Sequence, residues 1–530
     1  MSLSIYDEIV NSSHSIYASL PSHGQPVIRN NGVHEWTILA TISLVVPCSP
    51  IHDVDIDNDN DKKNENEDKN EIIPISLGTG VKCLPYTKLS QYGDTLHDSH
   101  AEIIARRGFI RWLISQATLC VRMSNEPRAE EGEQRDIDNN EQRDREQEEV
   151  YVEFDHGSGS FHLKKGVQVY LYISMLPCGD ASTVYTASHQ SHEEALNWVE
   201  SDASTSSTTS ATSTLNSELE QVMRGRNGYK SISSLRTKPG RPDSIPSISM
   251  SCSDKIASWS VLGIQGGLLS NLFREPIYLD GIVIGGIEIP HQHQHQLDWK
   301  ENVIREEVER ALWRRLISIK DHLPTPYRLH RPSIVFSSIP FIHSKPTIQS
   351  TLPLDNKYEP SPSPLSISHL PFLPPSGKGV KGEIIFDGSI LGHPWKKDSR
   401  IKEKGRSRIC KISLLVEYER LLESFNKGGN ANDIESTGKT SYYDHKHSSR
   451  SKSTYQLAKS ILRGIPSPGG KLKGLETIDD LYSTVEPINH KSHSGGNDSL
   501  HLPSTPPFKG WLVSGKQFES FTSSSDLTKD

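Results

Sequence analysis

Cysteine is scarce in this sequence, with six residues scattered over 530 positions. Disulfide-stabilised domains need many closely spaced cysteines, so this distribution excludes a disulfide framework and indicates reduced thiols. No apolar run reaches the ~18 residues that a membrane-spanning helix needs. The first eight residues have neither the basic region nor the apolar region of a secretory signal. These absences predict a protein of the cytoplasm or the nucleus that has no membrane partner.

Hydrophobic residues make up only 34% of the chain, and its formal net charge is −8. The negative charge is concentrated in two segments, 52–71 and 122–150, each of which carries −6. The remainder therefore carries +4, which is compatible with a polyanionic partner but does not identify one. A core of ordinary composition that is diluted by polar inserts explains the low apolar content better than several full domains do.

We therefore predict a single domain over residues 1–530, acting as a monomer. The inserts contain too few apolar residues to pack and are expected to be disordered; they are 49–71, 122–149, 200–229, 345–379, 426–452 and 484–506. The ordered core is expected at 1–48, 72–121, 150–199, 230–340, 380–425, 453–483 and 507–523.

Stretches rich in β-branched residues alternate along the chain with segments of helical periodicity. Strands are predicted at 35–47, 73–77, 150–154, 167–175, 276–284 and 382–387, with a tight turn at 78–82. Helices are predicted at 3–20, 99–119, 253–262 with a serine cap, 297–319, 409–425 and 455–463. This alternation favours an α/β (α+β) fold in which a mixed β-sheet is flanked by helices.

Four side chains that suit metal chemistry lie close to predicted helix starts. His100 and Glu102 stand two positions apart, and Cys178 and Cys252 lie further along the chain. One imidazole and two thiolates make a three-ligand zinc site with an open fourth position, which is the catalytic arrangement. Zinc lowers the pKa of a water in that position, and Glu102, which is not a ligand, can carry the proton.

The pattern H-x-E followed by P-C is typical of zinc nucleobase deaminases. That pattern ends in C-x-x-C, whereas the residue three positions after Cys178 is Ala181. The second thiolate must therefore come from a distant segment, and Cys252 is the best candidate. Each motif alone is more often a solvated helix start or an ordinary loop, and it is their ordered combination that favours catalysis.

Several longer blocks resemble the RNA-editing adenosine deaminases, most closely the branch that acts on tRNA; they are 78–83, 98–107, 177–180, 235–241, 250–259 and 263–266. The resemblance implies a cytidine-deaminase-like three-layer core with a C-terminal extension around an inositol phosphate. It also implies a hydrolase that converts adenosine to inosine and releases ammonia. The implied substrate is the adenosine 3′ of the anticodon, position 37, in alanine tRNA.

The resemblance assigns roles to individual residues. It places the zinc ligands at His100, Cys178 and Cys252 and the catalytic proton shuttle at Glu102. A polar relay from the zinc site towards the inositol phosphate would use Asp98, Lys238, Lys255 and Gln265. Contacts to the substrate would come from Thr79, Lys82 and Arg241.

Members of this family also bury an inositol hexakisphosphate, and its contacts here would be Arg106, Arg107, Lys255, Trp259, Tyr455, Lys459 and Trp511. The sequence supports a buried anion independently. Arg107 shares a predicted helix face with Ile103 and Ile110, and a buried arginine is costly without a counter-charge. Two positions depart from the family pattern, because Ser258 replaces an arginine contact and Gly267 replaces a serine.

Two other functions fit the same residues. An editing deaminase of structured messenger RNA would share the chemistry, and a catalytically silent tRNA-binding scaffold would keep only the anion site. No double-stranded-RNA-binding module precedes the catalytic blocks, so we expect a tRNA substrate. The four intact site residues favour an enzyme over a scaffold. A second metal site at His291–His295 is not favoured, because Pro290 and the intervening glutamines predict a surface loop.

Overall fold

The structure is a computed structural model that describes residues 4–47, 70–125, 149–189, 222–225, 232–240, 244–287, 297–353, 358–371, 382–393, 399–426, 440–447, 454–464 and 506–524. Most of the residues expected in inserts lie outside this description, as do Arg241, His291–His295 and the expected core residues 190–199 and 465–483.

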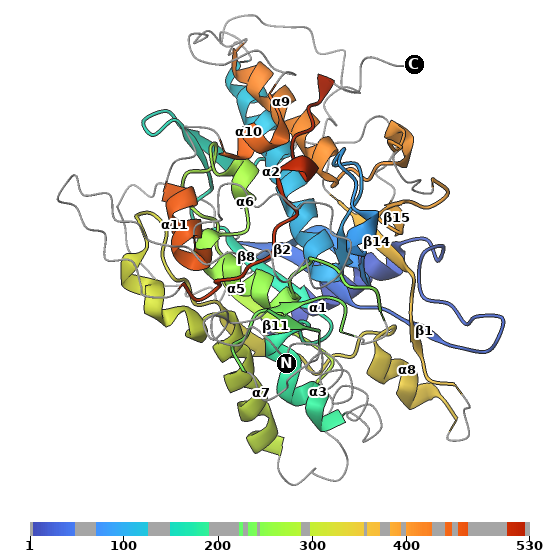
Figure 1. Ribbon diagram of the computed structural model, residues 1–530. Coiled ribbons are helices and arrows are strands. Elements are labelled where there is room, and N and C mark those ends of the chain that lie inside the picture. The colour runs from blue at the N-terminus through green and yellow to red at the C-terminus, as the bar shows by residue number, and fades with distance from the viewer. Residues whose placement is uncertain are drawn as a thin grey trace, which may run out of the picture.

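An eight-stranded mixed sheet forms the centre of the molecule (Figure 1). Its order is β12 (Ser333–Phe336), β11 (Gly281–Ile284), β8 (Gln168–Ile173), β2 (Leu39–Pro47), β3 (Asn70–Thr79), β14 (Leu365–His369), β15 (Glu383–Phe386) and β16 (Ser389–Ile390). The pairs β12–β11 and β11–β8 are parallel, and every later pair is antiparallel. The prediction of a mixed sheet flanked by helices is confirmed.

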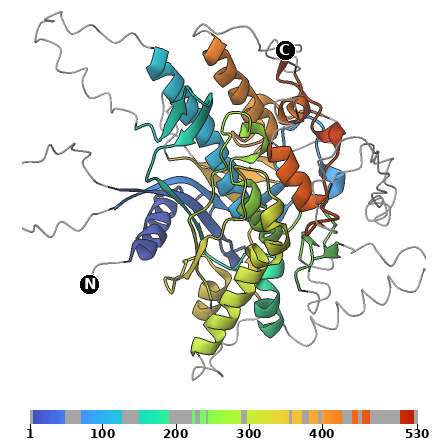
Figure 2. The ribbon, with the colours of Figure 1, turned by 90° about the vertical axis from the view of Figure 1, so that its left-hand side faces the viewer.

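The two faces of the sheet are covered by different helices, α1 (Ile5–Ser19) and α2 (Ala101–Asn125) (Figure 2). Side chains alternate along a strand, so one strand supplies both cores. In β2, Ile42 and Leu44 join the core beneath α2, whereas Leu39 packs in the core beneath α1. The buried character of both faces explains why β2 is an almost continuous apolar run.

The remaining strands are β1 (Glu35–Trp36), β4 (Val81–Cys83), β5 (Asp98–His100), β6 (Val152–Asp155), β7 (Ser160–Leu163), β9 (Met223–Arg224), β10 (Arg236–Thr237) and β13 (Ser361–Pro362). The other helices are α3 (Thr183–His189), α5 (Cys252–Leu262), α6 (Gly266–Leu269), α7 (Leu297–Leu312), α8 (Lys345–Thr351), α9 (Lys411–Asn426), α10 (Tyr442–His447) and α11 (Thr454–Arg463). Short 3-10 segments are η1 (Tyr86–Lys88), η3 (Asp180–Ser182), η5 (Arg314–His322), η6 (Glu403–Gly405) and η8 (Lys516–Phe518). In the part of the chain described, no helix has the length and apolar character needed to cross a membrane.

The C-terminal helices gather around α2 and α5. Helix α9 packs on α2, α10 on α9, and α11 on α5. The last described segment, 506–524, runs past these helices, as the red trace in Figure 1 shows. Its carbonyl groups at Glu519 and Phe521 accept hydrogen bonds from the first residues of α10. The space enclosed between α2, α5 and these C-terminal elements holds the second part of the candidate site.

Several boundaries differ from those predicted. Within the expected insert 345–379, the structure contains α8 and β14, and β14 is an interior strand of the sheet that pairs with β3 and β15. The proline and serine content of the segment hid this strand, and one of its two partners, β3, comes from a distant part of the chain. Likewise β9 and α10 lie within the expected inserts 200–229 and 426–452. The predicted turn at 78–82 is mostly strand, and the helix predicted at 297–319 changes to 3-10 geometry after Leu312.

Close packing of α2 on β3 depends on glycine at position 78. A Cβ atom added to Gly78 would lie 2.5 Å from the Ala101 carbonyl oxygen and 2.9 Å from the Ala105 amide nitrogen. Both are backbone atoms, so Gly78→Ala is expected to destabilise the fold by about 1–3 kcal/mol. Chemical denaturation would measure this loss. Gly382→Ala is the control, because its added Cβ would have no neighbour closer than 3.5 Å, and equal stability of the two variants would contradict the prediction.

Candidate active site

Three elements and one loop bring the four predicted catalytic side chains together. His100 is the last residue of β5, Glu102 is the second residue of α2, and Cys252 is the first residue of α5. Cys178 lies in the loop that follows β8. Helix α5 was predicted to begin at Ser253 with a serine cap; it begins at Cys252 and its cap is Ser251, whose hydroxyl accepts a 3.1 Å hydrogen bond from the Asp254 amide. Cys252 therefore sits at a helix N-terminus, which favours a thiolate.

Direct contacts join the imidazole and the two thiols. The Cys252 amide donates to the Cys178 sulfur at 3.4 Å, and the Cys178 side chain is hydrogen-bonded to both the Cys252 thiol and the His100 ring. The hydrogen bond from Cys252 lowers the pKa of Cys178 well below its usual range. Burial raises the pKa of Cys252, and the neighbouring Cys178 sulfur raises it further. One proton shared between two sulfurs explains the opposite directions.

Asp98 orients the histidine. The His100 Nδ1 atom lies 2.9 Å from Asp98 Oδ1, so the ring is held through this nitrogen. Although burial lowers it, the pKa of His100 is raised to about 9, chiefly by Asp98. Burial alone would raise the pKa of Asp98, but Lys238 and Lys255 hold it well below its usual range. Asp98 is thus an ionised carboxylate that lies between the Lys238 and Lys255 ammonium groups.

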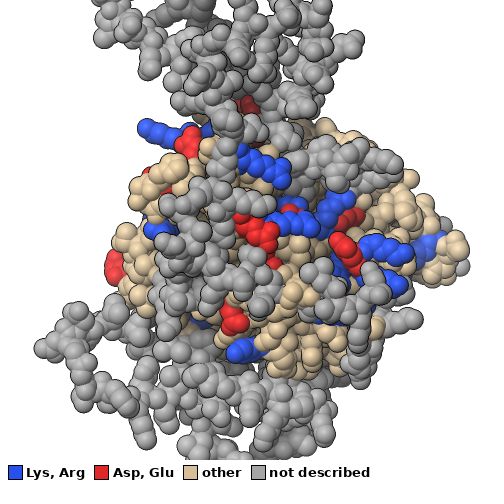
Figure 3. Space-filling view, turned by 90° about the horizontal axis from the view of Figure 1, so that it is seen from above, with Lys and Arg blue, Asp and Glu red and all other residues tan. Residues whose placement is uncertain are grey.

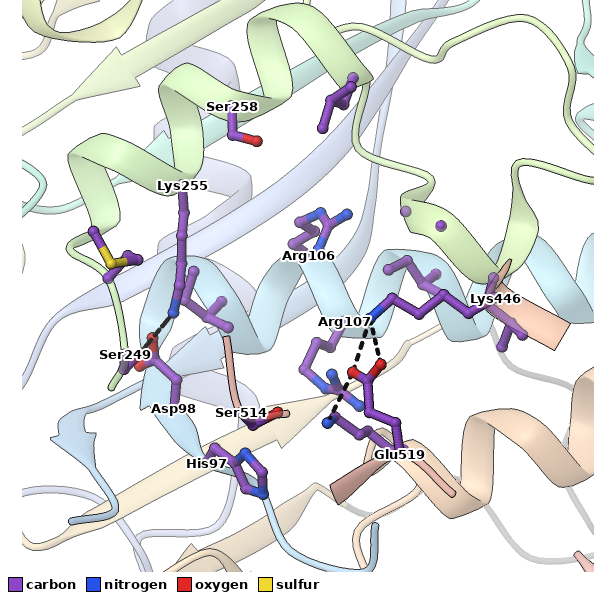
Figure 4. Close-up of a pocket in the computed structure, with 18 of the residues that line it drawn as sticks. His97, Asp98, Arg106, Arg107, Ser249, Lys255, Ser258, Lys446, Ser514 and Glu519 are labelled. Carbon is purple, nitrogen blue, oxygen red and sulfur yellow. Dashed lines mark hydrogen bonds and ion pairs between the residues drawn. The ribbon is translucent and has the colours of Figure 1, made fainter. Parts of the chain in front are cut away.

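A polar chain leads away from this carboxylate. The Lys238 ammonium donates to Asp98 at 2.8 Å and to the Cys252 sulfur at 3.1 Å. Lys255 also bonds Asp98, and Ser249, which the sequence analysis missed, bonds both Asp98 and Lys255 at 2.8 Å. Figure 4 shows Ser249, Asp98 and Lys255 at one end of a pocket. Three of the four predicted relay residues therefore join the metal-ligand positions to that pocket.

Gln265, the fourth predicted relay residue, makes its hydrogen bonds outside this chain. Its amide nitrogen donates to the Leu262 carbonyl at 3.2 Å, and its oxygen accepts from the Ile277 amide at 3.1 Å. These bonds make it a structural link between the end of α5 and the segment that precedes β11. It lines the pocket but does not contact Asp98 or Lys255 through any of these bonds.

Glu102 is a buried carboxyl group with an unpartnered oxygen. Only 1% of the residue is exposed, and its Oε2 atom has no hydrogen-bond partner among the described residues. Burial raises its pKa, and the negative charge on Cys178 raises it further. A carboxyl group with a raised pKa and a free oxygen beside the metal-ligand positions is suited to accept and release a proton.

The donor set fits a catalytic metal. No group of three or more His, Cys, Asp or Glu side chains in the described ranges already has the geometry of an assembled metal site. Instead the imidazole and the two thiols hydrogen-bond to one another, as described above. One nitrogen and two sulfur donors, with a nearby carboxyl oxygen that lacks a partner, are the chemistry of a three-ligand zinc site with an open position.

A cavity of about 330 Å³ lies between α2, α5 and the C-terminal elements. All seven residues predicted to contact an inositol phosphate line it: Arg106, Arg107, Lys255, Trp259, Tyr455, Lys459 and Trp511. Lys411, Lys446 and Arg463 also line it and were missed by the sequence analysis. Lys446 could not have been found easily, because it lies in a segment that was expected to be an insert.

The cavity is strongly cationic. Its described lining contains seven Lys or Arg side chains but only two carboxylates, Asp98 and Glu519. The Arg106 Nε and Arg107 Nη2 atoms are buried without hydrogen-bond partners among the described residues, and Figure 4 shows both arginines projecting from α2. Burial lowers the pKa of Arg106 to about 10 and that of Lys411 to about 8. On the face seen in Figure 3, by contrast, described basic and acidic side chains are interspersed.

Arg463 lies beside Ser258, one of the positions at which the sequence departs from the pattern of the resembled family. The Arg463 guanidinium reaches from α11 and donates to the Ser258 hydroxyl at 2.8 Å. It stacks over the Trp511 ring at 3.8 Å from the centroid, and its Nε atom has no partner among the described residues. A cation is therefore present beside the position at which the family carries an arginine on α5, but it comes from a different helix.

The three residues predicted to contact the substrate differ from one another in where they lie. Thr79 is 2% exposed, and its hydroxyl accepts a 2.9 Å bond from the Ile367 amide, so it links β14 to β3. Lys82 is exposed on β4, and its carbonyl oxygen lies 3.3 Å from His100 Nδ1. Arg241 lies outside the described residues.

Comparisons with known proteins agree with this geometry. A sequence model of the adenosine-deaminase (editase) domain matches residues 76–466. The chain is 28% identical to the tRNA-specific adenosine deaminase 1 of Schizosaccharomyces pombe over 340 residues, 63% of this chain and 68% of that protein. It is 25% identical to the human protein of the same name, covering 86% of this chain and 96% of that protein. It is 31% identical to the double-stranded RNA-specific editase Adar of Drosophila melanogaster, covering 49% of this chain and 32% of that protein.

Proposed function

We propose that this chain converts adenosine to inosine in tRNA. The chain belongs to the adenosine-deaminase (editase) family of hydrolytic deaminases. The family predicted from the motifs is confirmed. The observation that carries the proposal is the convergence of His100, Cys178 and Cys252 beside the unpartnered carboxyl group of Glu102. The tRNA substrate is supported by the long coverage of relatives named as tRNA-specific, against the partial coverage of the duplex-RNA editase.

Each residue has a defined task in the proposed reaction. His100, Cys178 and Cys252 would hold a zinc ion, which supplies Lewis-acid activation of the attacking water. The target base must leave its stack to reach these buried groups. Glu102 Oε2 accepts a proton from the water whose oxygen bonds to C6, and passes it to the ring nitrogen beside C6. It then accepts the proton of the new C6 hydroxyl and passes it to the amino group, which leaves as ammonia when the C6–N bond breaks and the C6 carbonyl of inosine forms. Asp98 fixes the His100 ring, and Lys238 stabilises the Cys252 thiolate.

The substrate proposal extends to the adenosine 3′ of the anticodon in alanine tRNA. Purified protein, assayed with an alanine tRNA transcript and with a long RNA duplex, is expected to form inosine at that position of the tRNA and to leave the duplex unedited. The same protein preparation is expected to contain one zinc per chain, and His100→Ala is expected to lose both zinc and activity. Editing of the duplex alone would favour a messenger RNA editor, and zinc-free, inactive protein would favour a scaffold.

We further propose that the cationic cavity binds inositol hexakisphosphate. A ligand with several phosphates can pair with many cations at once, and charge-assisted hydrogen bonds to phosphate are stronger than neutral ones. Such an anion would satisfy the free nitrogens of Arg106, Arg107 and Arg463, each of which is costly to bury unpaired. The polar chain through Lys255 and Asp98 would then connect the anion to the metal-ligand positions.

Binding of this anion is expected to weaken as the pH rises from 7 to 9. Burial lowers the pKa of Lys411 to about 8, with Glu519 opposing and Lys446 and Arg107 adding to the effect. Lys411 is therefore charged at pH 7 and largely neutral at pH 9, so one cation is lost. Titration calorimetry with inositol hexakisphosphate would measure the change, which should be smaller in Lys411→Met. A pH-independent affinity would contradict this role of Lys411.

A further inference from the structure

A buried cluster of charged side chains lies beside the two turns that contain Cys178 and Cys252, and its arginine comes from η5. Each cysteine is followed two positions later by an aspartate, Asp180 after Cys178 and Asp254 after Cys252, and both aspartates are 0% exposed. The Arg315 guanidinium lies between them. Its Nη2 atom is 2.7 Å from Asp254 Oδ1, and its Nη1 atom is 3.6 Å from Asp180 Oδ2. Arg315 therefore bonds Asp254 and lies within ion-pair distance of Asp180, whose Oδ2 atom is also held by the Arg310 guanidinium at 2.7 Å.

The surroundings of Arg315 leave it no other charge partner in the described structure. Its side chain is 4% exposed, and the guanidinium lies over the Phe508 ring at 4.7 Å from the centroid. Its Nε and Nη1 atoms have no hydrogen-bond partner among the described residues. An arginine is costly to bury unless it is paired, and its planar fork suits two carboxylates at once. These contacts fix the guanidinium between the two aspartates.

Both aspartates are connected in turn to the residues of the candidate site. Asp254 Oδ2 accepts bonds from the Ser251 hydroxyl at 2.7 Å and from the Arg236 amide at 2.9 Å. It therefore joins the start of α5 to the strand that immediately precedes Lys238. On the other turn, Asp180 Oδ1 accepts a 2.9 Å bond from the Ser233 amide.

The two turns also touch each other directly. The Ser253 amide donates to the Cys178 carbonyl at 3.0 Å, and the Ala181 amide donates to the Ser253 hydroxyl at 3.0 Å. At Gly179, whose φ is +104°, a Cβ atom would lie 2.3 Å from the Ser251 hydroxyl oxygen. The turns are thus packed at backbone distance, and the Asp180–Arg315–Asp254 group holds that contact from outside.

We propose that Arg315 is a positioning residue that sets the separation and direction of the Cys178 and Cys252 sulfurs, so that both are arranged for a metal before it binds. The inference rests on the zinc site of the proposed function. Some residues are not metal ligands themselves but hold the ligands in orientation. Replacing such a residue commonly changes metal affinity 10- to 100-fold. Arg315 differs from such groups only in acting on two ligands through the aspartates that follow them.

The test compares Arg315→Met with Arg314→Met. Methionine keeps an unbranched stem but removes the charge, and Arg314 is a 42% exposed neighbour that pairs with Glu309. Arg315→Met is expected to bind zinc about 10- to 100-fold more weakly and to release it faster to a chelator. In metal-free protein, its cysteines should also react with a disulfide reagent at rates different from wild type. Arg314→Met should match wild type in all three measurements.

Circular dichroism and thermal unfolding establish that the variants are folded. If Arg315→Met does not fold, Arg315→Lys decides the question, because an ammonium can pair with only one aspartate at a time and zinc affinity should then be intermediate. A folded Arg315→Met, or in its place a folded Arg315→Lys, with wild-type zinc release and thiol reactivity would overturn the inference and leave the zinc site standing. Failure of the wild type itself to bind zinc would overturn the proposed metal site, and this inference with it.

Discussion

Glu102→Ala is expected to lower inosine formation about 100- to 10,000-fold while the fold and zinc content remain as in wild type. This is the usual contribution of a positioned general acid or base. The Oε2 atom has no hydrogen-bond partner among the described residues, so the loss of this oxygen breaks no hydrogen bond. Sequencing of the product tRNA, in which inosine is read as guanosine, would measure the loss, and metal analysis would measure zinc.

Two companion variants separate proton transfer from shape and charge. Glu102→Gln keeps the size of the side chain but cannot carry a proton, so it is expected to be as inactive as Glu102→Ala. Glu301→Ala removes an exposed carboxylate on α7 that pairs with Arg305, and it should retain full activity. Wild-type rates in Glu102→Ala would end the assignment of the proton shuttle, whatever the metal content.

Arg107→Met is expected to produce protein that has lost its bound inositol polyphosphate and much of its stability. The seven cations of the cavity need a polyanion because the lining supplies only two carboxylates among its described residues. A ligand present at 1,000 times its Kd stabilises the native state by about 4 kcal/mol. Phosphorus analysis of the purified protein, and its unfolding temperature with and without added inositol hexakisphosphate, would measure the loss.

Arg122→Met is the matched control for this prediction. Arg122 lies on the same helix, α2, but is exposed and does not line the cavity. It should leave both phosphorus content and unfolding temperature unchanged. The anion proposal would be refuted if wild-type protein contained no phosphorus and unfolded at the same temperature whether or not the polyphosphate was added.

The difference between the predicted anion contacts and the observed cavity lining follows from where the cations lie in the sequence. Arg106 and Arg107 belong to the block that also contains His100 and Glu102, so a local motif was sufficient to find them. Lys446 and Arg463 lie in short helices beside poorly patterned segments, and only their packing around α2 and α5 places them in the cavity. Ser258 shows the same limit, because the arginine that donates to its hydroxyl lies 205 positions away.

The sequence alone determined the chemistry and the family, because residue types and their local spacing carry both. His100, Glu102, Cys178 and Cys252 were identifiable without a fold, and so were most of the elements that hold them. Only the tertiary structure decided that Thr79 and Gln265 are structural, that β14 belongs inside the sheet, and that Arg315 joins both cysteine turns. The physical reason is that these roles depend on contacts between separated residues, from 12 positions between Gln265 and Ile277 to 288 between Thr79 and Ile367, and no local pattern encodes the partner.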